Sequence, residues 1–514
     1  MLVPLLVLAP ALLLLGSAIA GRGLESDLPA TGDYAALELY TRLAAQGRQL
    51  LGPYSRFGFH HPGPAYFYAS VPLYVLSGDR FAGILLTAAL VNAAGIVLLL
   101  WRVGREGGAA ALVAAALVVA LFVSWRGPSW LFSAWNPNVA VMPFGLALVS
   151  LAAVAAGRDG ALPVAALAGS FAVQTHLGCL PATVAAGLAA LVLLVPRARS
   201  AAGLPPPPAL RRGWLILTAL VLAVLWAPPL VEQLRPDGGN LGHIVSFVAR
   251  RGEGHPAGEA LATAGAAIAG WLFRARDSSA RAVLVLVVVA LASAHGAARH
   301  ARQPFAAALS LVTFAGVAAA VLSAARATGP LLPYLFRWMA MLAVATAAAL
   351  AAGVAPLVAA RARAPRRPRL LATIGVVTLA LVSGRNLALA RATSEAPPAA
   401  PEDSEAAARL SDAIASALAG TSPRPLVEVG PHVDRDLVLG VLLGLDKKGR
   451  PFAVQPFGPF RLGGRWRPDG AEDARLVLGE EDAALAATPG VRLLGREAGL
   501  FAYLVPRGAA GRRP

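Results

Sequence analysis

The polar stretch DLPATGDYAALELYTRLAAQGRQLLGPYSRFGFHHPGPAYFY, residues 27–68, lies between one apolar segment and a long series of others. It holds three acids, two adjacent histidines and five tyrosines. The segment before it, residues 1–20, has the roughly 20 apolar residues that a spanning helix needs. Since that segment lacks the basic start of a signal peptide, we expect an uncleaved first helix. The polar stretch is then the first loop at the membrane surface.

Apolar runs continue beyond this loop along most of the 514-residue chain, which is 57% hydrophobic and 14% charged, with a mean hydropathy of +0.63. Their length and their alanine and leucine content favour helices over barrel strands, which would be about half as long. The runs are 64–77, 81–101, 109–123, 139–156, 161–173, 180–195, 214–226, 282–294, 305–324, 335–360 and 370–387. Counting crossings back from the basic connector that follows run 180–195 disagrees by one with counting forward from an internal N-terminus, so either 64–77 is not a full span or a later run is re-entrant. The sequence predicts a polytopic α-helical membrane protein with about 11–13 spans.

The net charge of +17 resembles that of a nucleic-acid-binding protein, but its distribution indicates topology instead. Many arginines lie in short loops between apolar runs, where positive charge marks the cytoplasmic side. The strongest markers are RARSAAGLPPPPALRR (197–212) and RARAPRRPR (361–369). We therefore expect a lipid bilayer and no nucleic acid as a partner.

The pattern changes after the last apolar run. PPAAPEDSEAA reads as a linker, and residues 410–419 and 434–445 read as helices. PLVEV, FAVQPF, ARLVLG and LFAYLVP read as short strands. We expect a small α/β domain of about 90–100 residues on the outer face. The predicted division is a transmembrane helical domain, 1–390, with its first external loop at about 21–63, followed by a linker and the α/β domain, 391–514.

Two acids of the first loop are candidates for chemistry. On a helix, Glu38 is an i,i+4 neighbour of Tyr34, while Asp33 lies near the helix start. Asp33 is either a catalytic carboxylate or an N-cap that satisfies free backbone N–H groups. Glu38 is either catalytic or part of a solvated helix face.

The end of the loop, YSRFGFHHPGPAYFY (54–68), has a more specific pattern. Pro62 and Pro64 break one helix and start the next, since proline is tolerated in a first turn. His60 and His61 then lie at the mouth of a span, where they either bind substrate or make a structural hydrogen bond. Tyr66, Phe67 and Tyr68 suit either a substrate site or the aromatic belt of the membrane interface. The other substrate-binding candidates in this run are Tyr54 and Arg56.

Later helix ends carry similar polar residues. The segments SWRGPSWLFSAWNPN, FAVQTHLG and YLFRW contain the candidates Arg126, Asn136, His176 and Arg337. Arginine forks suit phosphate, and tryptophan faces suit sugar rings or isoprenoid chains. No Walker A loop, nucleotide-binding GxGxxG, HExxH or GxSxG occurs, so nothing indicates a soluble nucleotide-sugar or ATP site.

The first loop resembles that of the GT-C class of polytopic glycosyltransferases, and of the bacterial lipid-linked mannosyl and arabinosyl transferases among them. The family pattern is a first helix, an external loop with an acid, and a loop end H-P-x-x-Y-Y/F. Here the loop end reads HHPGPAYFY, from His60 to Tyr68, and the acid lies in GDYAALELY. Family members often have an adjacent acidic pair, whereas here Tyr34 follows Asp33.

This resemblance implies an enzyme: an inverting glycosyltransferase that takes a sugar from a polyprenyl-phosphate donor by direct displacement. Asp33, with Glu38 as the nearest other acid, would accept the proton of the acceptor hydroxyl. Arg56, Arg126 and Arg337 would stabilise the leaving lipid phosphate. Some family members use a divalent metal and others do not. The residues here indicate no metal site and no cofactor.

The expected acceptor is an envelope glycan, lipid or protein at the outer face of the inner membrane, with the C-terminal domain on the same, extracytoplasmic side. Two alternatives stay open. A transporter or flippase of lipid-linked glycans should carry ionisable groups inside its spans, and few appear here. A non-catalytic membrane protein of envelope assembly would use the C-terminal domain for binding.

Overall fold

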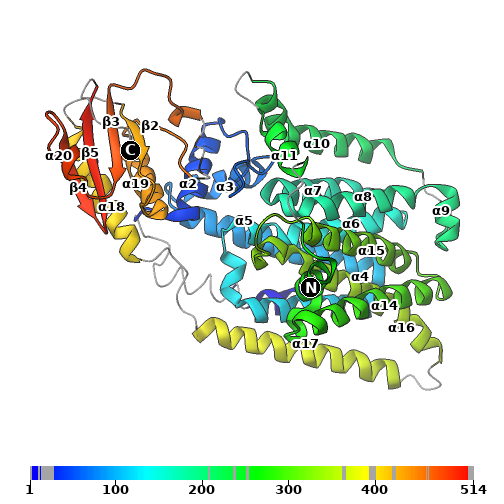
Figure 1. Cartoon of the computed structure of the whole chain (residues 1–514). Coiled ribbons are helices and arrows are strands. Elements are labelled where there is room, and N and C mark those ends of the chain that lie inside the picture. The colour runs from blue at the N-terminus through cyan, green and yellow to red at the C-terminus, as the bar shows by residue number, and fades with distance from the viewer. Residues whose placement is uncertain are drawn as a thin grey trace. The chain divides into compact units, whose positions relative to one another are not determined.

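The computed structural model describes residues 3–9, 12, 28–206, 209–235, 239–249, 254–361, 366–392, 401–419, 424–458, 460, 462 and 464–507. The chain divides into two compact units, which are described separately (Figure 1). The first unit comprises Met1–Arg22, Leu86–Leu230 and Val248–Ala396, and the second comprises Gly23–Leu85, Val231–Phe247 and Pro397–Pro514. The first loop of the sequence therefore belongs to the same unit as the C-terminal region.

The first unit is a bundle of apolar helices, which confirms the polytopic helical class. Its helices are α4 (Ala82–Arg126), α5 (Asn136–Val139), α6 (Val141–Ala155), α7 (Leu162–Thr175), α8 (Leu180–Val192), α9 (Pro196–Ala201), α10 (Arg212–Gln233), α12 (Ala257–Gly265), α13 (Trp271–Phe273), α14 (Asp277–His300), α15 (Pro304–Ala325), α16 (Ala340–Arg361) and α17 (Arg366–Ala392). Among the described residues, seven helical segments are long and apolar enough to cross a membrane, and four apolar helices are shorter. The seven are fewer than the 11–13 predicted spans because α4 counts once although it contains two of the runs, and because runs such as those of α7 and α8 form helices of only 14 and 13 residues. Residues 1–20 lie mostly outside the described part of the chain.

Helix α4 contains two of the predicted apolar runs. The backbone at Gly108 leaves helical geometry, with φ of 81° and ψ of −178°. A Cβ atom on Gly104 would lie 3.3 Å from Cδ2 of Leu112. Eight residues apart on a straight helix, these positions would be separated by about 12 Å. The chain therefore turns back at Gly108, as the separate runs 81–101 and 109–123 predict.

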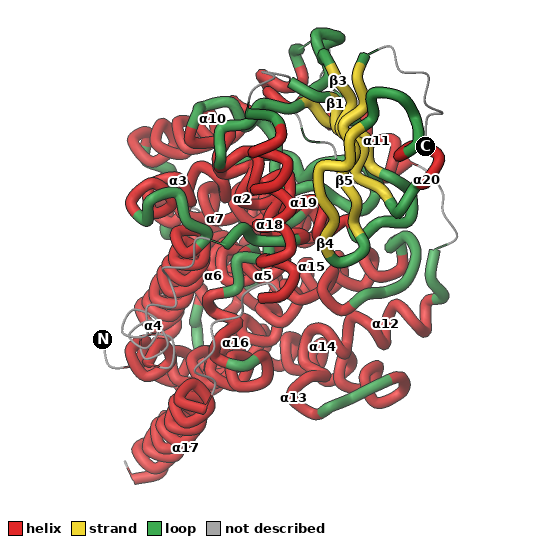
Figure 2. The backbone as a smooth tube through the Cα atoms, turned by 90° about the vertical axis from the view of Figure 1, so that its left-hand side faces the viewer, coloured by secondary structure: helices red, strands yellow, loops and turns green. Residues whose placement is uncertain are grey.

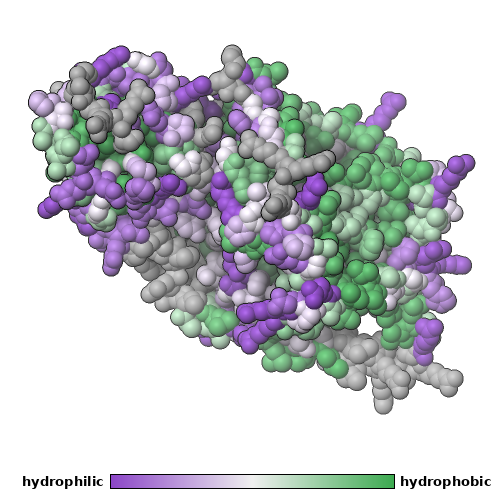
Figure 3. Space-filling view, viewed as in Figure 1, coloured by the Kyte–Doolittle hydropathy of each residue, from purple (hydrophilic) through white to green (hydrophobic). Residues whose placement is uncertain are grey.

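Burial separates the centre of the bundle from its surface. In the segment Asn136–Ala155, 94% of the residues in the most apolar 18-residue stretch are buried. In the corresponding stretch of α10, only 6% are buried. Figure 3 shows hydrophobic side chains covering the flank of the helices, with hydrophilic side chains at the right-hand edge. A large exposed apolar surface of this kind is unfavourable in water and favourable against lipid chains.

Small residues let the central helices approach one another closely. A Cβ atom on Gly316 of α15 would lie 2.8 Å from Cδ2 of Leu342, and one on Gly353 of α16 would lie 2.8 Å from the Ala294 carbonyl oxygen. Close backbone approach through small residues is the usual source of packing energy between helices in lipid. Larger side chains at these positions would push the helices apart.

Polar contacts gather several loops at one end of the bundle. The buried guanidinium of Arg199 donates to the carbonyl oxygens of Ala155, at 2.6 Å, and Leu193, at 3.0 Å, and so holds the ends of α6 and α8. The ion pairs nearby are Glu106–Arg158 at 2.8 Å and Asp159–Arg211 at 2.7 Å. The loop near Arg105, the end of α6 and the proline-rich connector thus share one end, as expected if all three face the same aqueous side.

The second unit combines the first loop with an α/β domain. Its helices are α2 (Gly32–Ala45), α3 (Ala65–Leu76), α11 (Asn240–Ala249), α18 (Pro401–Ala417), α19 (Arg435–Lys447) and α20 (Ala483–Ala486). Its strands are β1 (Leu426–Val429), β2 (Ala453–Val454), β3 (Ala474–Gly479), β4 (Arg492–Glu497) and β5 (Leu500–Pro506). The strands form one sheet in the order β2-β1-β3-β5-β4, visible side by side in Figure 2. The expected small α/β region is confirmed.

Two details of this region differ from the sequence prediction. Helix α18 begins at Pro401, within the predicted linker, because Glu402 and Asp403 in its first turn favour the positive end of a helix dipole. Strand β4 was not predicted. It pairs with β5 at the edge of the sheet, with a register shift between Leu493 and Gly495.

Candidate functional site

The loop before α3 folds back on itself as a short antiparallel turn. Tyr54 and His60 form an isolated bridge, and the His61 N–H donates to the Pro53 carbonyl at 2.8 Å. Helix α3 begins at Ala65, directly after Pro64, as the two prolines predict. The turn therefore fixes His60 and His61 just before the start of an apolar helix.

A side chain far along the chain fixes the same turn. The Asn240 Oδ1 accepts from the His60 backbone N–H at 2.8 Å, and the Asn240 Nδ2 donates to the His60 carbonyl at 2.9 Å. The side-chain amide of Asn240 thus pairs with both backbone polar groups of His60, as the backbone of a neighbouring strand would. The His60 ring Nδ1 also lies 3.1 Å from the Gly52 carbonyl oxygen. His60 is therefore held by its backbone and by its ring.

Aromatic packing completes this turn. Phe247 of α11 lies 4.7 Å from the Phe57 ring and 5.0 Å from the Phe59 ring. The exposed Arg56 guanidinium stacks over Phe57 at 4.7 Å. His61 is 7% exposed and its ring meets the edge of Phe59. The turn thus carries Arg56 at its exposed side and both histidines at its buried side.

Asp33 lies in the first turn of α2 and is not its N-cap. The N-cap is Thr31, whose backbone is extended, so the capping alternative for Asp33 is wrong. The Tyr54 hydroxyl donates a hydrogen bond to Oδ1 of Asp33. The Tyr54 ring in turn packs 4.3 Å from that of Phe460, in the C-terminal domain. A partly exposed carboxylate is therefore oriented by a tyrosine that the C-terminal domain supports.

Glu38 is fully buried, so its expected place on a solvated face is wrong. Its Oε1 lies 2.6 Å from Nζ of Lys447 on α19 and accepts from the Tyr74 hydroxyl at 2.9 Å. Burial raises the pKa of the Glu38 carboxyl, and Lys447 and Tyr74 offset part of that rise. These contacts enclose the carboxylate between α2, α3 and α19.

A second set of charges joins the same helices. The Arg42 Nε donates to Oδ2 of Asp446 at 2.6 Å, and the Trp466 indole donates to Oδ1 of Asp446 at 3.2 Å. Arg465 also pairs with Oδ1 of Asp446. Since buried ion pairs are stable only with several partners, this network specifies how α2 docks on α19.

In the first unit, three of the predicted polar helix ends meet. The Arg337 Nη1 donates to Oδ1 of Asn138 at 2.6 Å, and its guanidinium stacks over Trp135 at 4.9 Å. The Asn136 Nδ2 donates to the Thr175 carbonyl at 3.0 Å, next to His176. The segments YLFRW, SAWNPN and FAVQTHLG therefore share one face, as predicted.

Two candidates of the first unit have distinct environments. His176 lies between α7 and α8, and burial lowers its pKa to about 4, so the ring is neutral near pH 7. It would contact a ligand by hydrogen bonding and not by charge. Arg126 stacks at 5.3 Å on Trp125, and its buried Nε finds no hydrogen-bond partner among the described residues.

The structure thus sorts the candidates into two groups. Asp33, Glu38, Tyr54, Arg56, His60 and His61 belong to the second unit, and Arg126, Asn136, His176 and Arg337 belong to the first. The sequence missed Asn240, Lys447 and Phe460, which lie outside the recognised loop. Asn240 opens α11, and no local pattern given above marks any of the three.

The bundle with its polar first loop and terminal sheet has the fold of the GT-C class of membrane glycosyltransferases. It is similar to two solved structures of ArnT from Cupriavidus metallidurans. With the form bound to undecaprenyl phosphate, the TM-score is 0.58 at 18% identity, covering 99% of this chain and 98% of that one. With the apo form, the TM-score is 0.55 at 17% identity, covering 97% of each chain. No protein-family model and no curated protein sequence matches the chain.

Proposed function

We propose that the protein is an inverting glycosyltransferase that moves a sugar from a polyprenyl-phosphate donor to an envelope glycan, lipid or protein. The observation that carries this proposal is the full-length likeness to a GT-C fold that was solved with undecaprenyl phosphate bound. The Asp33 carboxylate, in the loop where GT-C enzymes carry an acid, supports it independently. A large lipid-facing surface on the bundle suits a substrate with an isoprenoid tail.

Asp33 is the proposed general base. It is partly exposed, whereas Glu38 is buried and paired with Lys447. A general base must come within hydrogen-bond reach of the acceptor hydroxyl. The Glu38 carboxylate cannot do so because protein groups enclose it. We therefore assign the base to Asp33 and give Glu38 a structural role.

The leaving lipid phosphate needs cationic donors as its charge develops. Arg126 offers a buried Nε without a protein partner among the described residues, which a phosphate oxygen would satisfy. Arg337 is oriented by Asn138 and Trp135, so its planar fork is held in place before the substrate arrives. Arg56 is exposed at the tip of its turn and is the least restrained of the three.

The remaining candidates are proposed to bind substrate in different ways. His61 and Asn136 would orient polar groups of the sugar or acceptor. His176 would contribute a neutral ring. The doubly held His60 is assigned to shaping the turn. We place the reaction at the outer face of the inner membrane, with the C-terminal domain on that side, because the arginine-rich connectors mark the opposite, cytoplasmic ends.

The test is transfer of radiolabelled sugar from a panel of polyprenyl-phosphate donors by the purified full chain in lipid. Asp33→Asn should lower the transfer rate about 10²–10⁴-fold, the usual contribution of a general base. The matched control is Asp473→Asn, an exposed acid in the C-terminal domain. Full activity of Asp33→Asn would reject this base, and absence of transfer from every donor would reject the enzyme class.

A further inference from the structure

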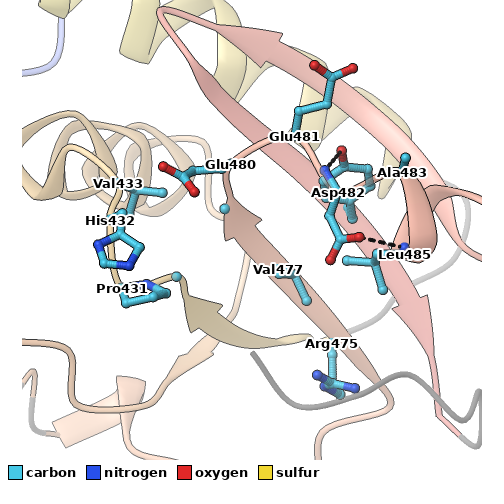
Figure 4. Close-up of a pocket in the computed structure, with 13 residues that line it drawn as sticks. Pro431, His432, Val433, Arg475, Val477, Glu480, Glu481, Asp482, Ala483 and Leu485 are labelled. Carbon is cyan, nitrogen blue, oxygen red and sulfur yellow. Dashed lines mark hydrogen bonds between the residues drawn. The ribbon is translucent and has the colours of Figure 1, made fainter.

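The C-terminal sheet carries a pocket that belongs to none of the residues discussed so far. It has a volume of about 340 Å³ and lies where β1 and β3 end (Figure 4). One wall is the loop after β1, from Gly430 to Val433, and the other is the loop after β3, from Gly479 to Leu485. This volume is at the small end of the range for ligand sites in proteins.

The topology of the sheet explains why a pocket forms here. Strand β1 lies between β2 and β3 and is parallel to both. The chain leaves β1 through α19 and reaches β2 on one side, and it leaves β3 through α20 toward β4 on the other side. Where connections from adjacent parallel strands diverge in this way, a crevice opens outside the carboxyl ends of the strands.

The connection through α19 and the connection through α20 also lie on opposite faces of the sheet. Gly495 of β4, which pairs with Ala502, approaches Leu410 and Ala413 of α18, and α18 packs on α19. The next residue, Tyr503, packs with Val477 and Leu485 on the other face, where α20 lies. Neither loop therefore crosses in front of the strand ends, and the crevice stays open.

Glycines end both strands and leave room between the loops. The Gly430 N–H donates to the Leu478 carbonyl at 2.9 Å, and a Cβ atom on Gly430 would come within 3.3 Å of the Gly479 Cα. At Gly479, an added Cβ would meet only Val477 Cγ1, at 3.9 Å. A side chain at position 479 would thus enter the pocket without a steric clash in the backbone.

The charge of the lining selects the kind of ligand. Glu480, Glu481 and Asp482 follow one another on the β3 loop, and Figure 4 places Glu480 beside His432. The lining cation Arg475 is already paired, with its Nε 2.9 Å from Oε2 of Glu428. The pocket is acidic within a chain of net charge +17. It would repel anions and attract cations.

Two observations favour an organic cation over a metal ion. Within the described ranges, no three His, Cys, Asp or Glu residues are grouped so as to hold a metal ion. Asp482 is partly engaged, since its carboxylate accepts from the Leu485 N–H at 2.8 Å and caps α20. Pro431, Val477 and Leu485 add apolar surface beside the acids. We propose that this pocket binds a small organic cation, with an alkylammonium group on Glu480 and a short carbon chain on the apolar wall. An ammonium group offers three N–H donors to such carboxylates.

The proposal is tested by calorimetric titration of the full chain in nanodiscs with putrescine, a linear diamine, with uncharged butanediol, and with magnesium chloride. Putrescine should bind and the other two should not. The double substitution Glu480→Gln/Glu481→Gln should weaken putrescine about tenfold, as expected for the loss of two exposed charges. Gly479→Leu should abolish binding by filling the pocket.

Asp473→Asn serves as a control for the loss of an acid elsewhere, since it removes one from the opposite end of β3 and should leave binding unchanged. Thermal unfolding followed by circular dichroism verifies the fold of each variant. If Gly479→Leu does not fold, the result with Glu480→Gln/Glu481→Gln decides whether the pocket is the binding site. Failure of putrescine to bind, equal weakening by Asp473→Asn, or binding that survives both pocket variants would overturn the proposal. None of these results depends on transfer activity.

Discussion

The Tyr54 hydroxyl donates to Oδ1 of Asp33, so the orientation of this carboxylate depends on a residue of the following turn. We expect Tyr54→Phe to lower kcat of sugar transfer about tenfold, because a hydrogen bond to a charged group contributes about 1.5–3 kcal/mol. Without the Tyr54 hydroxyl as a hydrogen-bond donor, the ionised form of the Asp33 carboxyl is less stable. The acidic limb of the pH–rate profile should therefore move to higher pH. Initial rates measured from acidic to neutral pH check both effects.

Phe460→Ala tests whether the C-terminal domain acts through that tyrosine. Removing the ring that packs on Tyr54 should shift the same acidic limb in the same direction, by a smaller amount. In a Tyr54→Phe background it should produce no further shift. A lower rate with an unmoved pH profile would mean that Phe460 serves stability alone.

Asn240 should be a strong determinant of stability for the turn before α3. Asn240→Leu removes the side-chain amide that pairs with the buried His60 N–H and carbonyl, at a cost of about 1–3 kcal/mol for each hydrogen bond. Thermal unfolding and hydrogen exchange at the His60 amide measure this cost. Gln233→Ala, which removes a more exposed acceptor for the Leu241 N–H, is the comparison and should stay within about 0.5 kcal/mol of wild type.

Glu38 should impose a pH dependence on folding stability. Its pKa is raised in the folded state, so its contribution to stability is fully present below the unfolded pKa and is lost as pH rises through the folded pKa. The melting temperature of wild type relative to Glu38→Gln should therefore fall as pH rises above the ordinary carboxyl range. Lys447 lowers this pKa, so in Lys447→Met the fall should occur at still higher pH. A difference independent of pH would contradict the buried-carboxylate assignment.

Arg337→Lys should impair donor use although the charge is kept. A lysine cannot both reach the Asn138 amide oxygen and stack flat on Trp135. We expect kcat/KM for the lipid donor to fall about tenfold, as for the loss of one charge-assisted hydrogen bond. Steady-state kinetics with a short-chain donor provide the measurement. Arg326→Lys, an exposed residue at the end of α15, should have no effect.

Local signals predict much of this fold. The apolar runs and the loop arginines indicate a polytopic bundle, and two prolines place the start of α3 within a residue. Strand β4 escaped prediction because its sequence, RLLGRE, is polar, contains a glycine and lacks a clear alternation. It is a strand because β5 supplies a hydrogen-bonding edge, which no window of the sequence contains.

Burial of Glu38 shows the same limit at the candidate site. A glutamate on an amphipathic helix is predicted to face solvent unless a cationic partner can be identified. Here that partner is Lys447, more than 400 positions along the chain. The Asn240 contact with His60 likewise joins residues 180 positions apart. Residue types near the first loop were therefore predictable, whereas the partners that decide their roles were not.

The ion pair between Arg42 and Asp446 joins residues 404 positions apart and has a consequence for biosynthesis. A growing chain emerges from its amino end, so α2 is made long before the helix that supplies Asp446 and Lys447. Until then, Glu38 and Arg42 have to remain hydrated, because enclosing them without counterions is costly. Closing so long a loop is also slow relative to local helix formation. The first loop therefore completes its packing only after α19 has been made.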